Sequence, residues 1–119
     1  ADGSPVRGTE GAEFVDVPYE PDQKFCRVLA ARVLAGVGIP LADVESPADA
    51  RDWSPTDRPE AWDVVVFNVA GQPGHIGVCI GRGRFLHVER GQRSRIARLT
   101  DPLWCSRIEG FYRYTGARA

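Results

Sequence analysis

The chain has 119 residues and a mass of 13.1 kDa, which is enough for one domain and too little for two. With 43% hydrophobic and 26% charged residues it has the composition of an ordinary globular domain, and no apolar run is long enough for a transmembrane helix. The first residues given show no basic-then-apolar pattern of a signal segment, and the absence of methionine, even at position 1, leads us to expect a processed chain or an excised domain.

The net charge of −1 conceals an uneven distribution. Residues 1–63 carry 13 acidic and 6 basic side chains, whereas residues 64–119 carry 3 acidic and 9 basic ones. The second half could in principle bind nucleic acid through its arginines, but no interleaved aromatic motif accompanies them, and we expect no nucleic-acid partner. The arginines concerned are Arg82, Arg84, Arg90, Arg93, Arg95 and Arg98.

Cysteines and histidines are few and widely spaced. The three cysteines are Cys26, Cys79 and Cys105, an odd number that argues against a disulfide framework. Together with the two histidines they form none of the close pairs that hold structural zinc, so we expect no metal site. No complete glycine-rich nucleotide loop is present either, and we expect no cofactor.

The N-terminal half indicates an arm, one helix and a long loop. Residues 1–13 lack apolar periodicity and predict a flexible arm or linker, whereas residues 14–119 form the folded domain. Residues 23–37 carry the strongest helix pattern, with Asp22 as the N-cap and two glycines at the end. Residues 41–61 are acidic and punctuated by prolines, which predicts a long loop.

The C-terminal half has the pattern of an antiparallel sheet. Alternating or wholly apolar segments bounded by turns predict five strands, over residues 63–68, 75–80, 84–89, 94–99 and 107–114. Turns are expected at residues 71–74 and 102–104. One helix followed by a meander of strands is an α+β layout.

Cys26 lies in the first turn of the predicted helix, where unpaired amides and the helix dipole favour a thiolate. A cysteine nucleophile also needs an imidazole within hydrogen-bond reach and a third group that orients this imidazole. The only histidines, His75 and His87, both fall in one predicted hairpin. The sequence therefore contains the parts of a Cys–His–His active site.

The loop of that hairpin decides whether the two histidines can cooperate. A two-residue turn at residues 82–83 would point the imidazoles to opposite faces of the sheet. A three-residue loop at residues 81–83 shifts the register by one, so that both rings share a face and Gly77 sits opposite His87. The two glycines of the loop favour this second register, and we expect the helix to lie over the face that carries the histidines.

Each of these residues also fits a structural role. A single cysteine in an amphipathic helix is commonly a small buried hydrophobe, and we assign this buried role to Cys79 and Cys105. A histidine in a strand is commonly a core or surface residue without a catalytic part. Spacing alone leaves the catalytic and the structural interpretation of Cys26, His75 and His87 open.

Several segments match one protein family in order and spacing. They are Pro18-Tyr19, Cys26 at a helix start, residues 63–67 (DVVVF), residues 75–78 (HIGV) and residues 81–87 (GRGRFLH). Over roughly residues 14–114 this pattern, including the twelve-residue separation of the histidines, resembles the NlpC/P60 superfamily of papain-like cysteine peptidases. The segment from Trp104 to Arg113 looks most like the bacteriophage-tail branch of that superfamily.

The resemblance implies a papain-like fold, in which an N-terminal helix carrying the cysteine packs on a small antiparallel sheet. It also implies a set of roles. Cys26 would be the nucleophile, His75 the general base and His87 the residue that orients His75. The residues that would border the oxyanion and the substrate are Tyr19, Arg27 and Gly77.

The family's typical reaction is cleavage of peptidoglycan stem peptides, often between γ-D-glutamate and a diamino acid. The resemblance therefore implies a peptidoglycan stem peptide as substrate and phage tail proteins as further partners. It also implies a location in a virion tail or in an extracellular or periplasmic space, and chemistry without a cofactor.

The sequence departs from the family around the nucleophile. The family's Asp-Cys-Ser-Gly-Leu is here residues 25–29 (FCRVL), so Phe25 replaces an acid, and Arg27 and Val28 replace two small residues. These changes favour a second hypothesis, in which the domain is catalytically degenerate and serves as a structural or assembly module of a phage tail tip. An arginine beside the thiol would, in turn, stabilise a thiolate.

Overall fold

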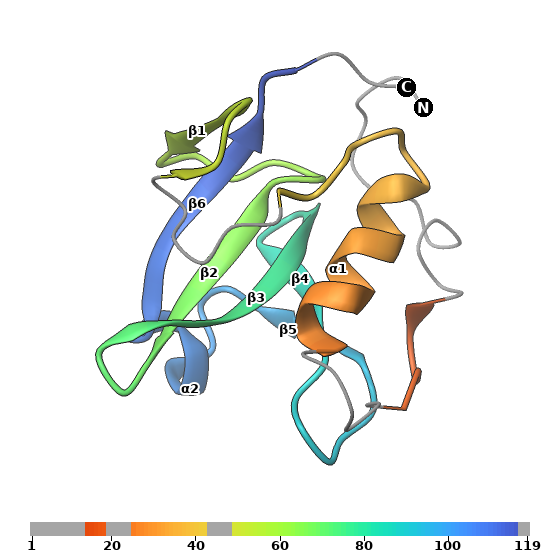
Figure 1. Ribbon diagram of the computed structural model, residues 1–119. Coiled ribbons are helices and arrows are strands. Elements are labelled where there is room, and N and C mark those ends of the chain that lie inside the picture. Colours follow the sequence, from red (N-terminus) through yellow and green to blue (C-terminus); the bar gives the residue numbers. More distant parts are fainter. Residues whose placement is uncertain (1–13, 19–24, 43–48, 117–119) are drawn as a thin grey trace.

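The computed structural model describes residues 14–18, 25–42 and 49–116, and within them one antiparallel sheet lies between two helices (Figure 1). The strands are ordered β1-β6-β2-β3-β4-β5, which confirms the predicted α+β class. None of the described helices is long and apolar enough to cross a membrane. The elements are α1 (Phe25–Ala35), β1 (Trp53–Thr56), β2 (Val64–Val69), β3 (Gln72–Gly81), β4 (Arg84–His87), β5 (Arg95–Arg98), α2 (Pro102–Cys105) and β6 (Ile108–Tyr114).

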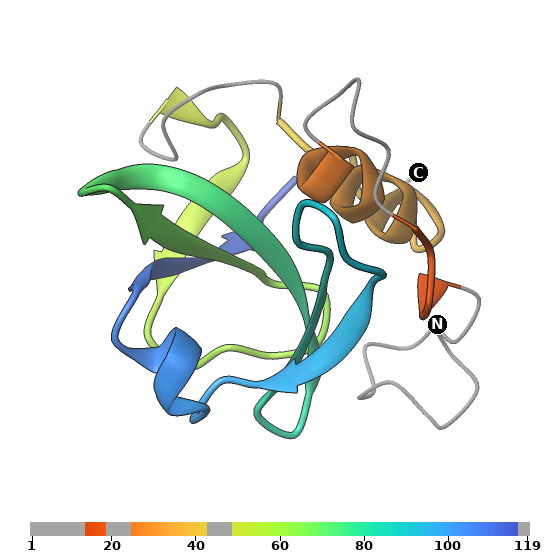
Figure 2. The same cartoon turned by 90° about the horizontal axis from the view of Figure 1, so that it is seen from below.

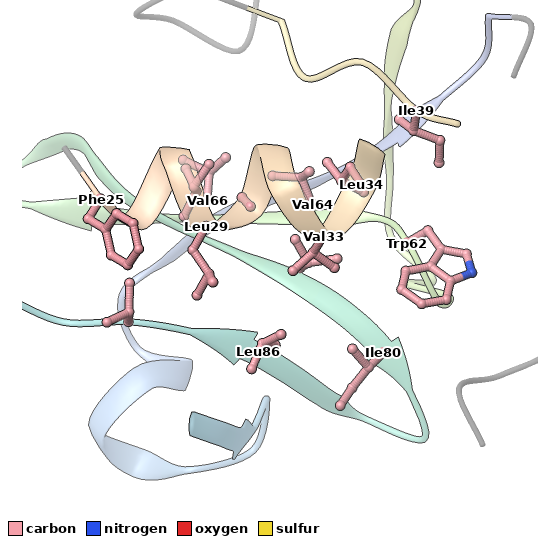
Figure 3. Packing of buried hydrophobic residues seen from close by; sticks show 14 residues of the cluster. Phe25, Leu29, Val33, Leu34, Ile39, Trp62, Val64, Val66, Ile80 and Leu86 are labelled. Atoms are coloured by element: carbon pink, nitrogen blue, oxygen red, sulfur yellow. The ribbon is translucent and has the colours of Figure 1, made fainter. Parts of the chain in front are cut away.

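Helix α1 forms because apolar side chains recur along one of its faces. This face packs on residues of β2, β3 and β4, as Figure 3 shows from close by. Gly38, at a φ of 76°, ends the helix as predicted, and the Ile39 amide donates to the Leu34 carbonyl at 3.0 Å. The predicted N-cap, Asp22, lies outside the described residues. The buried residues of α1 are Phe25, Leu29, Ala30, Val33 and Leu34.

The predicted strands correspond to β2 through β6, but two turns differ from expectation. The turn before β3 is made by Ala70 and Gly71, at φ of 53° and 81°, so residues 72–74 already belong to the strand. Alanine seldom adopts a positive φ, which is why residues 71–74, with two glycines and a proline, look like the turn in the sequence.

The predicted turn at residues 102–104 is the short helix α2, in which the Asp101 side chain accepts from the Leu103 amide at 2.9 Å.

One strand lies inside the segment that we predicted to be a loop. Strand β1 pairs with β6 at the edge of the sheet. Pro55 within it offers no amide to a ladder, and the segment has no apolar alternation. An edge strand tolerates such a proline, which explains why a sequence with the signature of a loop forms a strand here.

Alternation along the strands divides the side chains between two faces of the sheet. On one face Ile76, Val78 and Ile80 join the cluster under α1. On the other face Cys79 belongs to a second cluster that includes Trp104 of α2, and Figure 2 shows the two helices on opposite sides. Cys79 is buried as predicted, whereas Cys105 is exposed, because its neighbour in α2 takes the inward position.

A buried carboxylate ties the start of β2 to β6. Asp63 is 2% exposed, and its oxygens accept hydrogen bonds from the Arg113 guanidinium at 2.8 and 3.1 Å and from the Glu60 amide at 2.7 Å. The hydrogen bond to Asp63 raises the pKa of Arg113. Because a buried carboxylate without its cation is costly, this pair stabilises the junction of the two strands.

Arg113→Gln is therefore expected to lower the free energy of unfolding by about 2 kcal/mol, since it leaves the Asp63 carboxylate buried without its cation. The matched control is Arg93→Gln, whose ion pair with Asp16 is exposed and should be worth less than about 1 kcal/mol. Urea unfolding of the wild type and both variants measures the two losses. Equal losses would contradict a special role for the buried pair.

Candidate active site

A bulge in β3 sets the register of the hairpin that carries both histidines. Val78 pairs with Leu86 in the body of the hairpin. At the tip Gly81 pairs with Arg84, so the register shifts by one between Cys79 and Gly81. Continued along the strands, the pairing of the hairpin body brings His87 opposite Gly77, as expected from the sequence.

The tip itself is a two-residue turn made by Arg82 and Gly83, at φ of 57° and 70°. The prediction of a three-residue loop is therefore wrong. Both imidazoles nevertheless lie on the same face of the sheet, as that prediction required. The reason is that the bulge in β3 shifts the register by one residue, as the longer loop would have done.

His75 and His87 are hydrogen-bonded to each other. The distance from Nε2 of His75 to Nδ1 of His87 is 2.8 Å, and the ring centroids are 5.1 Å apart. Gly77 lies between the two and makes the approach possible. A Cβ at that position would lie 2.9 Å from Cδ2 of Phe85 and 3.3 Å from Cβ of His87. The glycine and the two histidines therefore form one packed unit.

The hydrogen bond defines what the remaining ring nitrogens can do. When Nε2 of His75 carries the proton and donates it, Nδ1 of His75 keeps a lone pair and can act as a base. This Nδ1 has no hydrogen-bond partner among the described residues. Nε2 of His87 is buried and also lacks a partner within the described part of the chain. The pair is thus arranged with one basic nitrogen available to a thiol.

Aromatic rings enclose the histidine pair. Trp104 stacks on His75 with centroids 5.4 Å apart and planes inclined by 24°, and it meets His87 edge-on at 4.7 Å. The ring centroid of Phe67 lies 5.6 Å from that of His75, and the ring centroid of Phe85 lies 4.7 Å from that of His87. Sequence reasoning did not identify Trp104 as a site residue. The signal that could have marked it is a tryptophan in a short turn that begins with proline.

This enclosure lowers the basicity of both imidazoles. Desolvation lowers the pKa of His75 from 6.5 to about 4. Desolvation also lowers the pKa of His87 from 6.5 to about 3, with further contributions from the charges of His75 and Arg95. Both rings are therefore neutral near pH 7, and a neutral His75 is the form that can accept a proton.

Cys26 lies in the first turn of α1 and is half-buried. Helix α1 covers the face of the sheet that carries Ile76 and Val78, which is opposite to the face that carries the imidazoles. The expectation that the helix lies over the histidines is therefore wrong, because the alternation that gathers the histidines turns the aliphatic residues of β3 toward α1. No hydrogen bond joins the Cys26 thiol to either imidazole within the described residues.

The start of α1 and the end of β4 nevertheless lie at the same end of the molecule. Phe25 and Val88, the sequence neighbours of Cys26 and His87, belong to the same core cluster. Figure 1 shows the first turn of α1 at the end of the molecule where β4 terminates. The start of the helix that carries Cys26 thus lies near the end of the strand that carries His87.

The other predicted site residues have varied placements. The Arg27 guanidinium donates through Nη2 to the Ala42 carbonyl at 2.5 Å, which draws it toward the segment after α1. Tyr19 lies outside the described residues. Pro18 pairs with Arg93 in an isolated bridge beside the loop between β4 and β5. Among the described residues no cluster of histidine, cysteine and acidic side chains could hold a metal ion.

Comparison with known proteins gives matches to the NlpC/P60 family. The model of the NlpC/P60 family matches residues 19–113. An NlpC/P60 family protein from Bacillus cereus ATCC 10987 has a TM-score of 0.72 and 21% identity, over 97% of this chain and 42% of its own. A similar-to-lipoprotein NLP/P60 family protein from Staphylococcus aureus subsp. aureus Mu50 has a TM-score of 0.71 and 21% identity, over 98% of this chain and 46% of its own.

The NlpC/P60 domain of the peptidoglycan hydrolase SagA has a TM-score of 0.62 and 17% identity, over 90% of this chain and 97% of its own. The chain thus spans less than half of the first two solved proteins and nearly all of the SagA domain. No curated protein matches the sequence. With a family model that covers most of the chain and a fold shared with solved members, the chain belongs to the NlpC/P60 family.

Proposed function

We propose that the domain is a cysteine endopeptidase that cleaves peptidoglycan stem peptides at the bond between γ-D-glutamate and a diamino acid. The observation that carries this proposal is the hydrogen bond between Nε2 of His75 and Nδ1 of His87, taken in the tautomer in which His75 donates. It leaves Nδ1 of a neutral His75 available as a base at the end of the sheet where α1 begins. The solved domain of the peptidoglycan hydrolase SagA, which has the same fold, supports the substrate class.

In the proposed reaction Nδ1 of His75 takes the proton of the Cys26 thiol, and the thiolate sulfur attacks the scissile carbonyl carbon. The backbone amide of Cys26, at the start of α1, is a donor for the oxyanion. His75 then returns the proton to the leaving amine, and water hydrolyses the thioester. His87 accepts from Nε2 of His75 throughout and holds the ring in its productive orientation.

A second candidate function is that of a degenerate module in the assembly of a phage tail tip. Two observations favour it. The ring of Trp104 stacks directly on His75, and the thiol of Cys26 makes no hydrogen bond to an imidazole within the described residues. The resemblance of the C-terminal segment to the tail branch gives the partner class, namely other tail proteins.

Cys26→Ala should abolish the release of stem-peptide fragments from purified muropeptides, with a loss of at least about 1,000-fold, because the reaction loses its nucleophile. The matched control is Cys105→Ser at the exposed thiol of α2, which should keep the wild-type rate. Chromatography with mass spectrometry measures the fragments. Equal rates for the wild type and Cys26→Ala would contradict the proposal.

Iodoacetamide labelling separates the two candidate functions without a substrate. In a Cys105→Ser background, which removes the exposed thiol, an active peptidase should be alkylated at Cys26 faster than at the buried Cys79, and His75→Ala should slow the reaction at Cys26. Peptide mapping after timed quenching gives the rates. Slow alkylation of Cys26 that does not depend on His75 would favour the assembly module.

The buried histidine pair also predicts how stability depends on pH. Between pH 6.5 and about 4 the unfolded chain binds protons at both histidines that the folded chain does not bind, so the free energy of unfolding should fall as the pH falls. At pH 4.5 the contribution of His75 to this fall should be about 2 kcal/mol. Urea unfolding at pH 7 and 4.5 measures the fall, which should be smaller in a His75→Gln/His87→Gln protein. An identical fall in the free energy of unfolding of the wild type and of this double variant would contradict the prediction.

A further inference from the structure

Arginines dominate the charge of the segment that contains β4 and β5. Residues 81–100 carry six arginines and a single acidic side chain, Glu89. Two of the six form ion pairs, Arg93 with Asp16 and Arg95 with Glu89. The ion pairs of the described residues include none of the other four, which are Arg82, Arg84, Arg90 and Arg98. The segment therefore has a surplus of positive charge that the described part of the chain does not pair.

Two of these arginines are placed directly opposite each other. Arg84 is the cross-strand partner of Arg98 in the pairing of β4 with β5, so their Cβ atoms lie about 5 Å apart on one face of the sheet. The adjacent turn contributes Arg82, at a φ of 57° that arginine seldom adopts. We refer to Arg82, Arg84 and Arg98 as the arginine patch. Like charges at opposed positions destabilise a strand pair, so the patch costs stability in the free protein.

The acidic side chain nearest to Arg98 along the chain is engaged elsewhere. It is Asp101, which accepts a hydrogen bond from the Leu103 amide at 2.9 Å and caps α2. On the opposite strand Nε of Arg84 is buried and has no hydrogen-bond partner among the described residues. A buried donor without a partner is costly, and more so when it is charged. An anion that draws the Arg84 guanidinium outward and accepts from it would remove this cost.

The patch is accessible and lies apart from the candidate active site. A Cβ added at Gly83, in the turn beside it, would have no atom within 4 Å, so the space there is open. Arg84 alternates with the same face as Leu86, which Figure 3 shows pointing toward α1, whereas His87 meets Trp104 on the other face. Along β4 the two ends of the strand, Arg84 and His87, are about 10 Å apart. A ligand on the patch therefore leaves the histidine pair uncovered.

A phosphate dianion suits this arrangement better than a carboxylate does. A phosphomonoester carries a charge of about −1.5 to −2 at pH 7 and three acceptor oxygens, so it can accept from two guanidiniums at once. A carboxylate has one charge and two oxygens, which a single arginine fork satisfies. Residues 81–84 and 95–99 contain no aromatic side chain on which a base could stack. The patch therefore favours recognition of the phosphate itself.

We propose that the arginine patch is a binding site for a phosphate dianion, either free phosphate or the terminal phosphate of a larger molecule. Arg84 and Arg98 are its two principal contacts, and Arg82 adds a third positive charge. The site goes beyond the proposed function, because neither Cys26 nor the histidines take part in it. It therefore serves an active peptidase and an assembly module equally. Binding relieves the repulsion between the opposed arginines and so stabilises the native state.

NMR titration of the isotope-labelled whole chain at pH 7.5 tests the site, with inorganic phosphate and glycerol 1-phosphate as the probes. Sodium chloride keeps the ionic strength constant, because exposed charges are screened by salt. We expect the Nε–H signal of Arg84 to shift, and Arg84→Gln and Arg98→Gln each to raise Kd at least about 10-fold. The matched control is Arg90→Gln, in the loop after β4, which removes the same charge and should change Kd less than about twofold.

The two probes distinguish the sources of the phosphate group. Equal affinity for both probes would identify free phosphate as sufficient. Tighter binding of glycerol 1-phosphate would identify the terminal phosphate of a larger molecule as the ligand. Either result supports the proposal, provided that the patch variants weaken it. Acetate at the same ionic strength should bind at least about 10-fold more weakly than phosphate, since it offers one charge and two oxygens.

Thermal unfolding adds a readout that a merely structural role of the arginines would not give. Without phosphate, Arg98→Gln should keep or raise the unfolding midpoint, because it removes the repulsion across the strands. Phosphate should raise the midpoint of the wild type more than that of Arg84→Gln/Arg98→Gln. The comparison of the two proteins removes the general stabilisation that excluded salts give to any fold.

Several results would overturn the proposal. They are the absence of phosphate binding, binding that Arg84→Gln/Arg98→Gln does not weaken, an equal loss in Arg90→Gln, and acetate binding as tight as phosphate binding. An unfolding midpoint that phosphate raises equally in the wild type and the double variant would also overturn it. None of these measurements uses peptide cleavage, so a failure of the proposed peptidase activity leaves their outcome unaffected.

Discussion

The register between β3 and β4 is the constraint on which the candidate site depends. Side chains alternate between the faces of a sheet, so a slip of one residue would turn one imidazole away from the other. The bulge between Cys79 and Gly81 prevents that slip, and Gly77 leaves the space in which the rings meet. One local irregularity in β3 thus determines whether His75 and His87 form a hydrogen-bonded pair or two unrelated core residues.

The same register has consequences on both sides of the sheet. It turns the aliphatic residues of β3 toward α1, so that the helix is anchored on the face opposite the histidines. On the histidine face it leaves an aromatic enclosure dominated by Trp104, which desolvates the pair and keeps both rings neutral near pH 7. The helix that carries the nucleophile candidate Cys26 begins at the end of the molecule where β4, the strand of His87, terminates. The orientation of His75 follows from the pairing of β3 with β4, and its desolvation follows from the aromatic rings packed on the same face.

Much of this arrangement could be predicted from the sequence, because it depends on local patterns. The helix at Phe25–Ala35 and the five C-terminal strands follow from periodicity. The shared face of the histidines was expected too, but the shift of register that produces it comes from a bulge and not from the predicted three-residue loop. The features that could not be predicted depend on context. Strand β1 contains a proline that only an edge position tolerates, and Ala70 adopts a positive φ that its residue type does not indicate. The contact of Trp104 with the histidines joins residues far apart in the chain, which no local pattern reveals.

The central claim is that Cys26, His75 and His87 act together, and the distance between two atoms tests it most directly. A crystal structure of the wild-type protein in its reduced form would measure the separation of Sγ of Cys26 from Nδ1 of His75. A catalytic pair requires hydrogen-bond reach, about 3–4 Å when the looser geometry of a free enzyme is allowed. We expect a distance within this range, with His75 still bonded to His87 through Nε2. A thiol well beyond that reach, or turned into the core beneath α1, would contradict the account.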